Sequence, residues 1–115
     1  MALSDAALVT AANAVNTATT HLGLHSGAPG AAGTSNVVGS RVAIGSKAVD
    51  ADGDISWTNT NFTGLTANQS VTHVSYWTAS SGGTFNGSSA LTGDTTANAA
   101  GEYSVPTVTE NFVGA

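Results

Sequence analysis

The chain has 115 residues with two Lys or Arg, seven Asp or Glu and no Cys, which gives a formal net charge of −5 at pH 7. Nucleic acid and anionic membranes are bound by clustered cations, and Arg41 and Lys47 alone cannot form such a cluster. The lack of cysteine excludes disulfides and thiolate metal sites. The length predicts one domain over residues 1–115.

The first predicted element is a helix over residues 4–19. Ser4 is a favourable N-cap, and Asp5 suits the positive end of the helix dipole. Leu3 and Leu8 flank the cap with the spacing of a hydrophobic staple. The apolar stripe is narrow, so we expect this helix to pack on another element.

From residue 21 the hydrophobic pattern changes to a period of two, which indicates strands. Strand candidates follow at 21–25, 41–45, 47–49, 55–59, 71–79, 84–91 and 101–109. Residues 27–36 form a predicted small-residue loop. The fold class predicted is mainly β (α+β), with the N-terminal helix followed by a six- to seven-stranded antiparallel β-sandwich or barrel over about residues 21–112.

Three dipeptide or tripeptide signals predict the turns between these strands. Asp52-Gly53 predicts a two-residue hairpin, and Ser81-Gly82-Gly83 predicts a second one. Asn86-Gly87 predicts a further turn close by.

Alternating aspartates at Asp50, Asp52 and Asp54 resemble the start of a calcium-binding loop. In such a loop position six is glycine and position twelve is a bidentate acid, but Ile55 and Asn61 stand at these places. We therefore interpret the aspartates as a solvated hairpin tip and predict no metal site.

The three histidines are His21, His25 and His73. His21 and His25 share one face of a predicted strand but lie roughly 13 Å apart, too far to hold one metal. We expect half-exposed strand positions, with a pH-sensitive contact as the alternative. No nucleophile elbow, zinc-protease helix or phosphate loop is present, so we predict no enzyme activity, no catalytic residue and no cofactor.

The aromatic residues Trp57, Tyr76 and Trp77 lie in predicted strands. Tyr76 and Trp77 are adjacent and must face opposite sides, so we expect one ring in the core and the other near a surface. Core packing is favoured, and the alternative is a platform on which sugars stack.

Four segments taken in order, 21–30, 41–44, 71–79 and 82–85, resemble a family of small virion proteins in tailed bacteriophages of actinobacteria. These proteins are usually called minor tail or tail-fibre proteins, and similar small folds serve as capsid decoration proteins. The resemblance covers almost the whole chain. Ala28 departs from it, because we expect an acid before the Pro-Gly of that loop.

The resemblance implies a non-enzymatic structural protein on the virion surface, made in the bacterial cytoplasm. We expect a capsid decoration protein that stabilises the outer head surface, because the chain is short and lacks a coiled-coil stalk. A minor tail protein is nearly as well supported. The alternative is a carbohydrate-binding module that recognises host-surface glycans.

The partners implied are the major capsid protein or tail subunits, bridged by a homo-oligomer for which we expect a trimer. The helix and the 27–36 loop are the predicted contact surface. The side chains expected to contribute to an interaction surface are Leu3, Leu8, His25, Pro29, Trp57, Tyr76 and Trp77.

Overall fold

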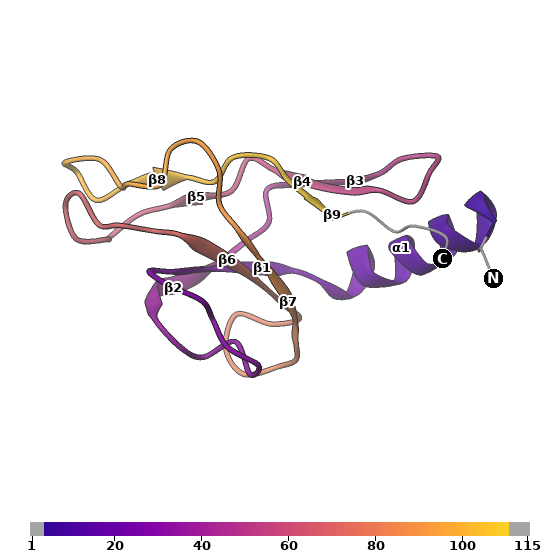
Figure 1. Cartoon of the computed structure of the whole chain (residues 1–115), viewed down its shortest axis with the longest axis horizontal. Helices are drawn as coiled ribbons and strands as arrows, with labels where there is room; N and C mark the ends of the chain where they lie inside the picture. Colours follow the sequence, from indigo (N-terminus) through magenta and orange to yellow (C-terminus); the bar gives the residue numbers. More distant parts are fainter. Residues whose placement is uncertain (1–3, 111–115) are drawn as a thin grey trace.

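A computed structural model describes residues 4–110 (Figure 1). Within this range the chain forms one helix and nine strands, so the predicted mainly β fold with an N-terminal helix is confirmed. The elements are α1 (Asp5–Ala18), β1 (His21–His25), β2 (Val37–Ala43), β3 (Ser46–Val49), β4 (Ile55–Thr58), β5 (Asn61–Phe62), β6 (His73–Trp77), β7 (Phe85–Ala90), β8 (Tyr103–Ser104) and β9 (Val108–Glu110). Among these residues no helix combines the length and apolar character needed to cross a bilayer.

The helix α1 begins where the sequence predicts, because the Ser4 side chain accepts a hydrogen bond from the Ala7 N–H at 3.2 Å. Leu8 and Ala12 are its buried residues and face the β3–β4 hairpin, which lies over the helix in Figure 1. The last turn contains no basic residue of its own. Lys47 of β3 supplies the missing cation, since its Nζ donates to the carbonyl groups of Asn16 at 2.7 Å and Thr19 at 3.0 Å. Leu3 lies outside the described residues.

One antiparallel sheet has the strand order β2-β1-β6-β7. Strand β1 pairs with β6 along its whole length, from His21 opposite Trp77 to His25 opposite His73. This central strand is buried on both faces, with Leu22 and Leu24 directed into the core. We call this sheet the lower layer, from its place in Figure 1.

The upper layer is built from the short sheets β3-β4-β9 and β5-β8. The β4–β9 and β5–β8 ladders keep one constant register, from Ile55 opposite Glu110 to Phe62 opposite Tyr103. Between them Pro106 lacks the N–H that a ladder needs, although Val105 N–H still donates to the Thr60 carbonyl at 3.0 Å. The two sheets are therefore one ladder that is interrupted at proline.

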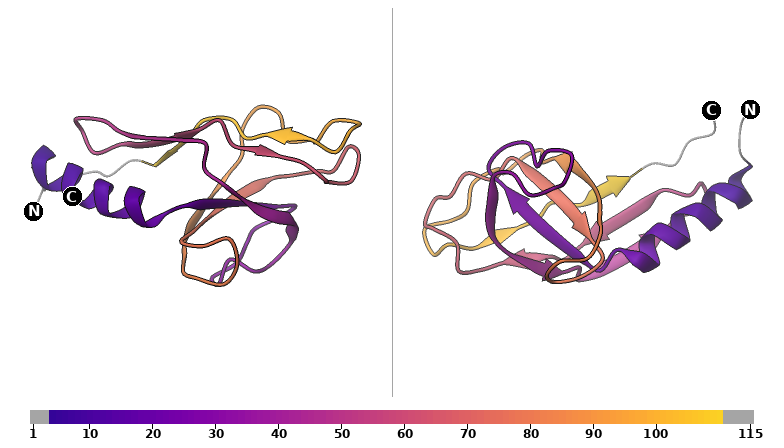
Figure 2. Two further views of the ribbon diagram at one scale, coloured as in Figure 1. Left: turned by 180° about the vertical axis from the view of Figure 1, so that it is seen from behind. Right: turned by 90° about the horizontal axis from the view of Figure 1, so that it is seen from below.

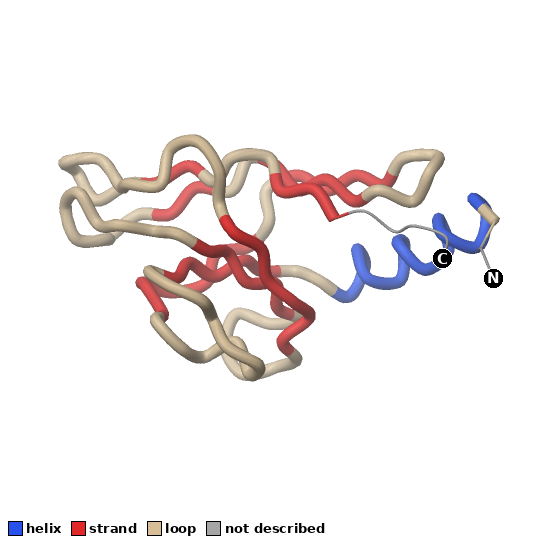
Figure 3. The backbone as a smooth tube through the Cα atoms, in the orientation of Figure 1, coloured by secondary structure: helices blue, strands red, loops and turns tan. Residues whose placement is uncertain are grey.

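The same ladder continues beyond β5 and β8 into the lower layer. Backbone hydrogen bonds join Leu65 to Gly101 at 3.0 Å and Val71 to Thr95 at 2.9 Å, and β6 then pairs with β7. Residues 55–110 thus form one long antiparallel hairpin whose tip lies near residues 80–83. Figures 2 and 3 show how it bends back, so that its far end crosses its near end as a second layer.

The core lies between the two layers. Trp57 of β4 meets Tyr76 of β6 edge to face, with ring centroids 4.7 Å apart and planes at 70°. Trp57 Nε1 also donates to Asn16 Oδ1 of α1 at 2.8 Å. The remaining buried apolar residues of this cluster are Ala12, Leu22, Leu24, Val38, Ile55, Phe62, Val71, Val74, Ala97, Tyr103, Val105 and Val108.

Several strand boundaries differ from those predicted. The predicted strand 101–109 is split into β8 and β9 at Pro106, and the short strand β5 was not predicted. Strand β2 begins at Val37 rather than residue 41, because the small-residue loop ends early enough to let Val37 pair with His25. These differences raise the strand number from the expected six or seven to nine within residues 4–110.

Two of the three predicted turns are present in the structure. The Asp52-Gly53 hairpin is confirmed, but its loop has three residues, because Asp50 N–H still bonds to the Asp54 carbonyl at 3.0 Å and Gly53 takes a φ of 86°. The turn at Ser81-Gly82-Gly83 is also confirmed. The turn at Asn86-Gly87 is wrong: Gly87 pairs with Tyr76 inside β7, and the register shifts at this point as in a β-bulge.

The close approach of Gly53 to α1 yields a test of how the helix is held. A Cβ at Gly53 would lie 2.9 Å from the Leu8 backbone, whereas a Cβ at Gly93 would meet nothing within 4 Å, and both residues have positive φ. We expect Gly93→Ala to lower the free energy of unfolding by about 1 kcal/mol through left-handed strain. Gly53→Ala should lose about 1–3 kcal/mol more through the clash. Urea unfolding of both variants measures this, and equal losses would contradict the packing described.

Candidate functional site

The described members of the predicted interaction set lie inside the protein. Trp57, Tyr76 and Trp77 are 1%, 4% and 6% exposed, so neither adjacent ring lies open at the surface as expected for one of them. The side chains of Leu8, His25 and Pro29 are buried as well. The rings therefore have no open face on which a sugar could stack.

A group of polar side chains instead lines a cavity on the outer face of the lower layer. It has a volume of ≈ 340 Å³ and lies between the loop that follows β1 and the tip of the β6–β7 hairpin. In Figure 1 these two loops lie below the sheet, on the side away from the upper layer. The residues that give it chemistry are His25, Arg41, Ser75 and Trp77.

The cavity exists because glycines occupy positions where side chains would fill it. Gly23 lies in β1 beside Ser75, and a Cβ there would come within 2.8 Å of Ser75 Oγ. Gly33 in the loop lets the chain approach the ring of Phe85, which in turn packs on Trp77 with centroids 5.3 Å apart. Larger residues at Gly23 or Gly33 would displace the groups that form the cavity.

A directed hydrogen-bond chain fixes the buried groups of the cavity. His25 Nδ1 donates to the Ser35 carbonyl at 2.7 Å, since a carbonyl oxygen can only accept. His25 Nε2 then accepts from Ser75 Oγ at 2.7 Å, and Ser75 Oγ accepts from Trp77 Nε1 at 2.7 Å. The Gly23 carbonyl, 3.4 Å from Ser75 Oγ, is the weaker alternative acceptor. Each side-chain nitrogen and oxygen of His25, Ser75 and Trp77 therefore has a hydrogen-bond partner, and the His25 imidazole is fixed as one tautomer.

The environment keeps this imidazole neutral. Burial lowers the pKa of His25, and the positive charges of His73 and Arg41 lower it further, while the hydrogen bond to Ser35 opposes them. Half-exposed positions were predicted for all three histidines. That prediction is confirmed for His21 and His73 but is wrong for His25, because the 26–36 loop covers it.

Ser75 and His25 have the spacing of a nucleophile and its base, but their surroundings give them a different role. Ser75 is completely buried, and its oxygen already receives the indole N–H of Trp77. A nucleophile needs a free path to the substrate carbon. This pair therefore organises the cavity.

Arg41 closes one side of the cavity. Its guanidinium lies over the ring of Trp77, with Cζ 3.4 Å from the ring centroid, as in a cation–π contact. Its Nη1 donates to the carbonyls of Ala79 at 3.0 Å and Gly82 at 2.7 Å, which ties β2 to the tip of the β6–β7 hairpin. Apart from the scarcity of cations, no local pattern predicts this contact, because Ala79 and Gly82 follow Arg41 by 38 and 41 positions.

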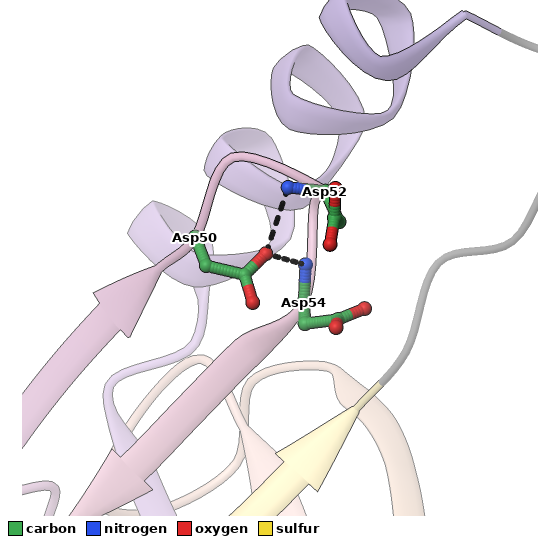
Figure 4. Close-up of side chains that lie close together, drawn as sticks. All are labelled: Asp50, Asp52 and Asp54. Atoms are coloured by element: carbon green, nitrogen blue, oxygen red, sulfur yellow. Dashed lines mark hydrogen bonds between the residues drawn. The ribbon is translucent and has the colours of Figure 1, made fainter.

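A second cluster lies at the β3–β4 turn, where Asp50, Asp52 and Asp54 come together (Figure 4). One carboxylate oxygen of each lies within 4.8 Å of the others. Asp50 Oδ1 accepts the backbone N–H groups of Asp52 at 2.9 Å and Asp54 at 3.0 Å. Partial burial and the two neighbouring acids raise the pKa of Asp54. Asp50 thus stabilises a hairpin tip, as interpreted from the sequence.

The neutral state of His25 makes stability depend on pH. An unfolded histidine takes up a proton near pH 6.5, and the folded protein resists this because the pKa of His25 is lowered. Stability contributed by the neutral ring is therefore complete above that pH and falls as the pH drops through it. We expect the free energy of unfolding to fall between about pH 7.5 and about pH 5.5 more steeply in the native protein than in His25→Asn.

Urea unfolding at both pH values provides the measurement. His21→Gln is the matched control, because it removes a histidine of the same sheet that is not among the groups lowering the pKa of His25, and it should retain the steep dependence. Parallel pH profiles for the native protein and His25→Asn would contradict the assignment.

A family model described as "Podophage GP4 fiber I protein gp80" matches residues 2–111. No curated protein and no solved structure matches the chain significantly. The resemblance to phage virion structural proteins is thereby confirmed at that level, while an actinobacterial host stays a prediction. Because the match extends over almost the whole chain, the protein belongs to the podophage GP4 fiber I protein gp80 family.

Proposed function

We propose that the chain is a non-catalytic subunit of a phage fibre, exposed on the virion and bound to neighbouring virion subunits. The observation that carries this is the family match over residues 2–111, which is described as a fibre protein. It favours a fibre over the head decoration that the chain length suggested. We infer that the subunit is made and assembled in the bacterial cytoplasm.

The chemistry of the described residues supports a binding role. Ser75 and His25 are engaged in the hydrogen-bond chain of the cavity. The three clustered aspartates lie at the β3–β4 turn, which Asp50 stabilises by accepting a backbone N–H. The surface is formed mainly by small uncharged side chains, as expected for a chain in which only 8% of residues are charged. Such a surface loses little favourable hydration when it is buried against a neighbour.

The face of α1 that points away from the β3–β4 hairpin is the best-placed contact surface. Its exposed residues Ala6, Thr10, Ala14 and Ala18 recur at four-residue spacing, so they share one side of the helix. Small side chains there allow another backbone to approach closely. The loop over residues 27–36 provides a second exposed surface, formed by Ala28, Ala31 and Ala32. We propose that copies of this chain associate through α1 and dock on fibre or tail subunits through the loop.

Imaging of the intact particle tests the location. A phage whose gene for this chain carries a short C-terminal tag, decorated with an antibody to the tag, should show the label on a fibre in averaged electron images. Label distributed over the head lattice would support the decoration role instead and overturn the fibre assignment. The untagged phage is the control for antibody specificity.

Substitution on α1 tests the contact surface separately. Ala14→Arg places a long charged side chain on the exposed helix face, and its desolvation on docking should lower incorporation into particles by about tenfold. Ala99→Arg adds the same side chain at an exposed position of the loop before β8 and should be incorporated normally. Both variants should unfold at the native urea midpoint. Equal incorporation of the two would show that α1 is not the contact.

A further inference from the structure

We propose that the cavity between the 26–36 loop and the β6–β7 tip binds an acidic sugar of a cell-surface polysaccharide, with Arg41 as the partner of its carboxylate. The proposal rests on the proposed function in taking a surface glycan as the ligand of a fibre subunit. The site is distinct from the exposed ring platform expected from the sequence, whose rings are buried.

The charge of Arg41 is the first argument. It is one of two cations in a chain of net charge −5, and the other, Lys47, is committed to the end of α1. Both hydrogen bonds of Arg41 within residues 4–110 run from Nη1 to neutral carbonyls, so Nε and Nη2 keep their donors. A guanidinium with two free donors matches a carboxylate in shape and charge.

The second argument is that the site is already ordered. Stacking on Trp77 and the bonds to Ala79 and Gly82 hold the guanidinium in one place. The hydrogen-bond chain through Ser75 and His25 holds the indole beneath it. Since the protein groups do not have to be ordered on binding, the entropy lost with the ligand is small.

The remaining lining matches a sugar rather than a simple anion. Hydroxyl groups of Thr34, Ser40, Ser80 and Ser81 surround the cavity and can exchange hydrogen bonds with sugar hydroxyls. At the rim Val37 is 59% exposed and offers an apolar surface to the C–H face of a pyranose. The volume of ≈ 340 Å³ lies at the lower end of the range of small-molecule pockets.

The net negative charge of the chain repels an acidic polymer once the two come within about 8 Å, because salt at physiological ionic strength screens the repulsion at larger separations. A single site should therefore bind weakly, with a dissociation constant in the millimolar range. Repetition of the site on an oligomeric fibre would raise the apparent affinity, because neighbouring sites meet neighbouring sugar units at high local concentration.

Nuclear magnetic resonance on the 15N-labelled chain tests the proposal directly. Trp57 and Trp77 give two indole N–H signals, of which only Trp77 lines the cavity. We expect D-glucuronic acid to shift the Trp77 signal and the amide signals of residues 80–82, and to leave the Trp57 signal unmoved. D-Glucose, which carries a hydroxymethyl group in place of the carboxylate, should shift them at least about tenfold less at equal concentration, because a lost charged hydrogen bond costs about that factor or more.

Inorganic phosphate identifies the source of the recognition. Shifts as large as those with glucuronate would show a general anion site and overturn the sugar assignment. The absence of shifts with both glucuronate and phosphate would overturn the site altogether. The outcome is independent of where the subunit lies on the virion, so this test and the imaging test can fail separately.

Variants assign the effect to Arg41. Arg41→Gln should reduce glucuronate binding by at least about tenfold, while Arg41→Lys, which keeps the charge but not the planar fork, should retain part of it. Lys47→Gln is the matched control, because it removes the other cation of the chain and should bind normally. Ser81→Ala leaves the Arg41 contacts in place and should weaken binding a few-fold through one lost hydrogen bond. Full binding by Arg41→Gln would contradict the proposal.

Discussion

The contact between Trp57 and Tyr76 is the interaction on which the two layers depend. Trp57 belongs to the upper layer and Tyr76 to the lower one, and their rings meet edge to face across the core. Trp57 also binds Asn16 of α1, and the Tyr76 hydroxyl donates to Glu110 of β9, so that one aromatic pair reaches the helix and both layers. Burial and the neighbouring Glu110 raise the pKa of Tyr76, which keeps the hydroxyl protonated as the donor that this bond requires. In a core with few large side chains, such a pair provides a large share of the buried apolar area.

Because side chains alternate along β6, the position of Tyr76 in the core also determines which side chains lie on the outer face of the sheet. Tyr76 faces the core, so its neighbours Ser75 and Trp77 face the other way, toward His25 of β1 and Arg41 of β2. The outer face would be open to water if the 26–36 loop and Phe85 did not cover it. The lower layer is therefore packed on both faces, apolar on one and polar on the other. The polar face retains a cavity because glycine residues, among them Gly23 and Gly33, line it and leave the space that side chains would fill.

Local signals in the sequence were enough to predict the helix cap at Ser4, the change of period at residue 21 and two of the three turns. They could not show that Asn86-Gly87 forms a bulge, because the partner Tyr76 that absorbs the extra residue lies ten positions earlier. The same limit applies to the cavity. His25 and Ser75 are fifty residues apart, and a period-two pattern gives the face of each but not which strands become neighbours. Alternation alone also cannot tell a surface face from one covered by a loop, so His25 was expected to be half-exposed.

The continuity of residues 55–110 has a consequence for how the protein reaches its fold. Pairing that starts at the tip near residues 80–83 closes a short segment, and each further pair toward Ile55 and Glu110 enlarges the loop only slightly. We expect this half of the chain to close like a zipper from the tip outward, and β1 to join β6 later, since their pairing spans about fifty residues. Substitutions beside the tip should then slow folding, whereas those in β9 or α1 should mainly accelerate unfolding. A chain still emerging from the ribosome cannot start this process until residues 78–85 at the tip have been made, so the helix at residues 5–18 waits for the strands that will hold it.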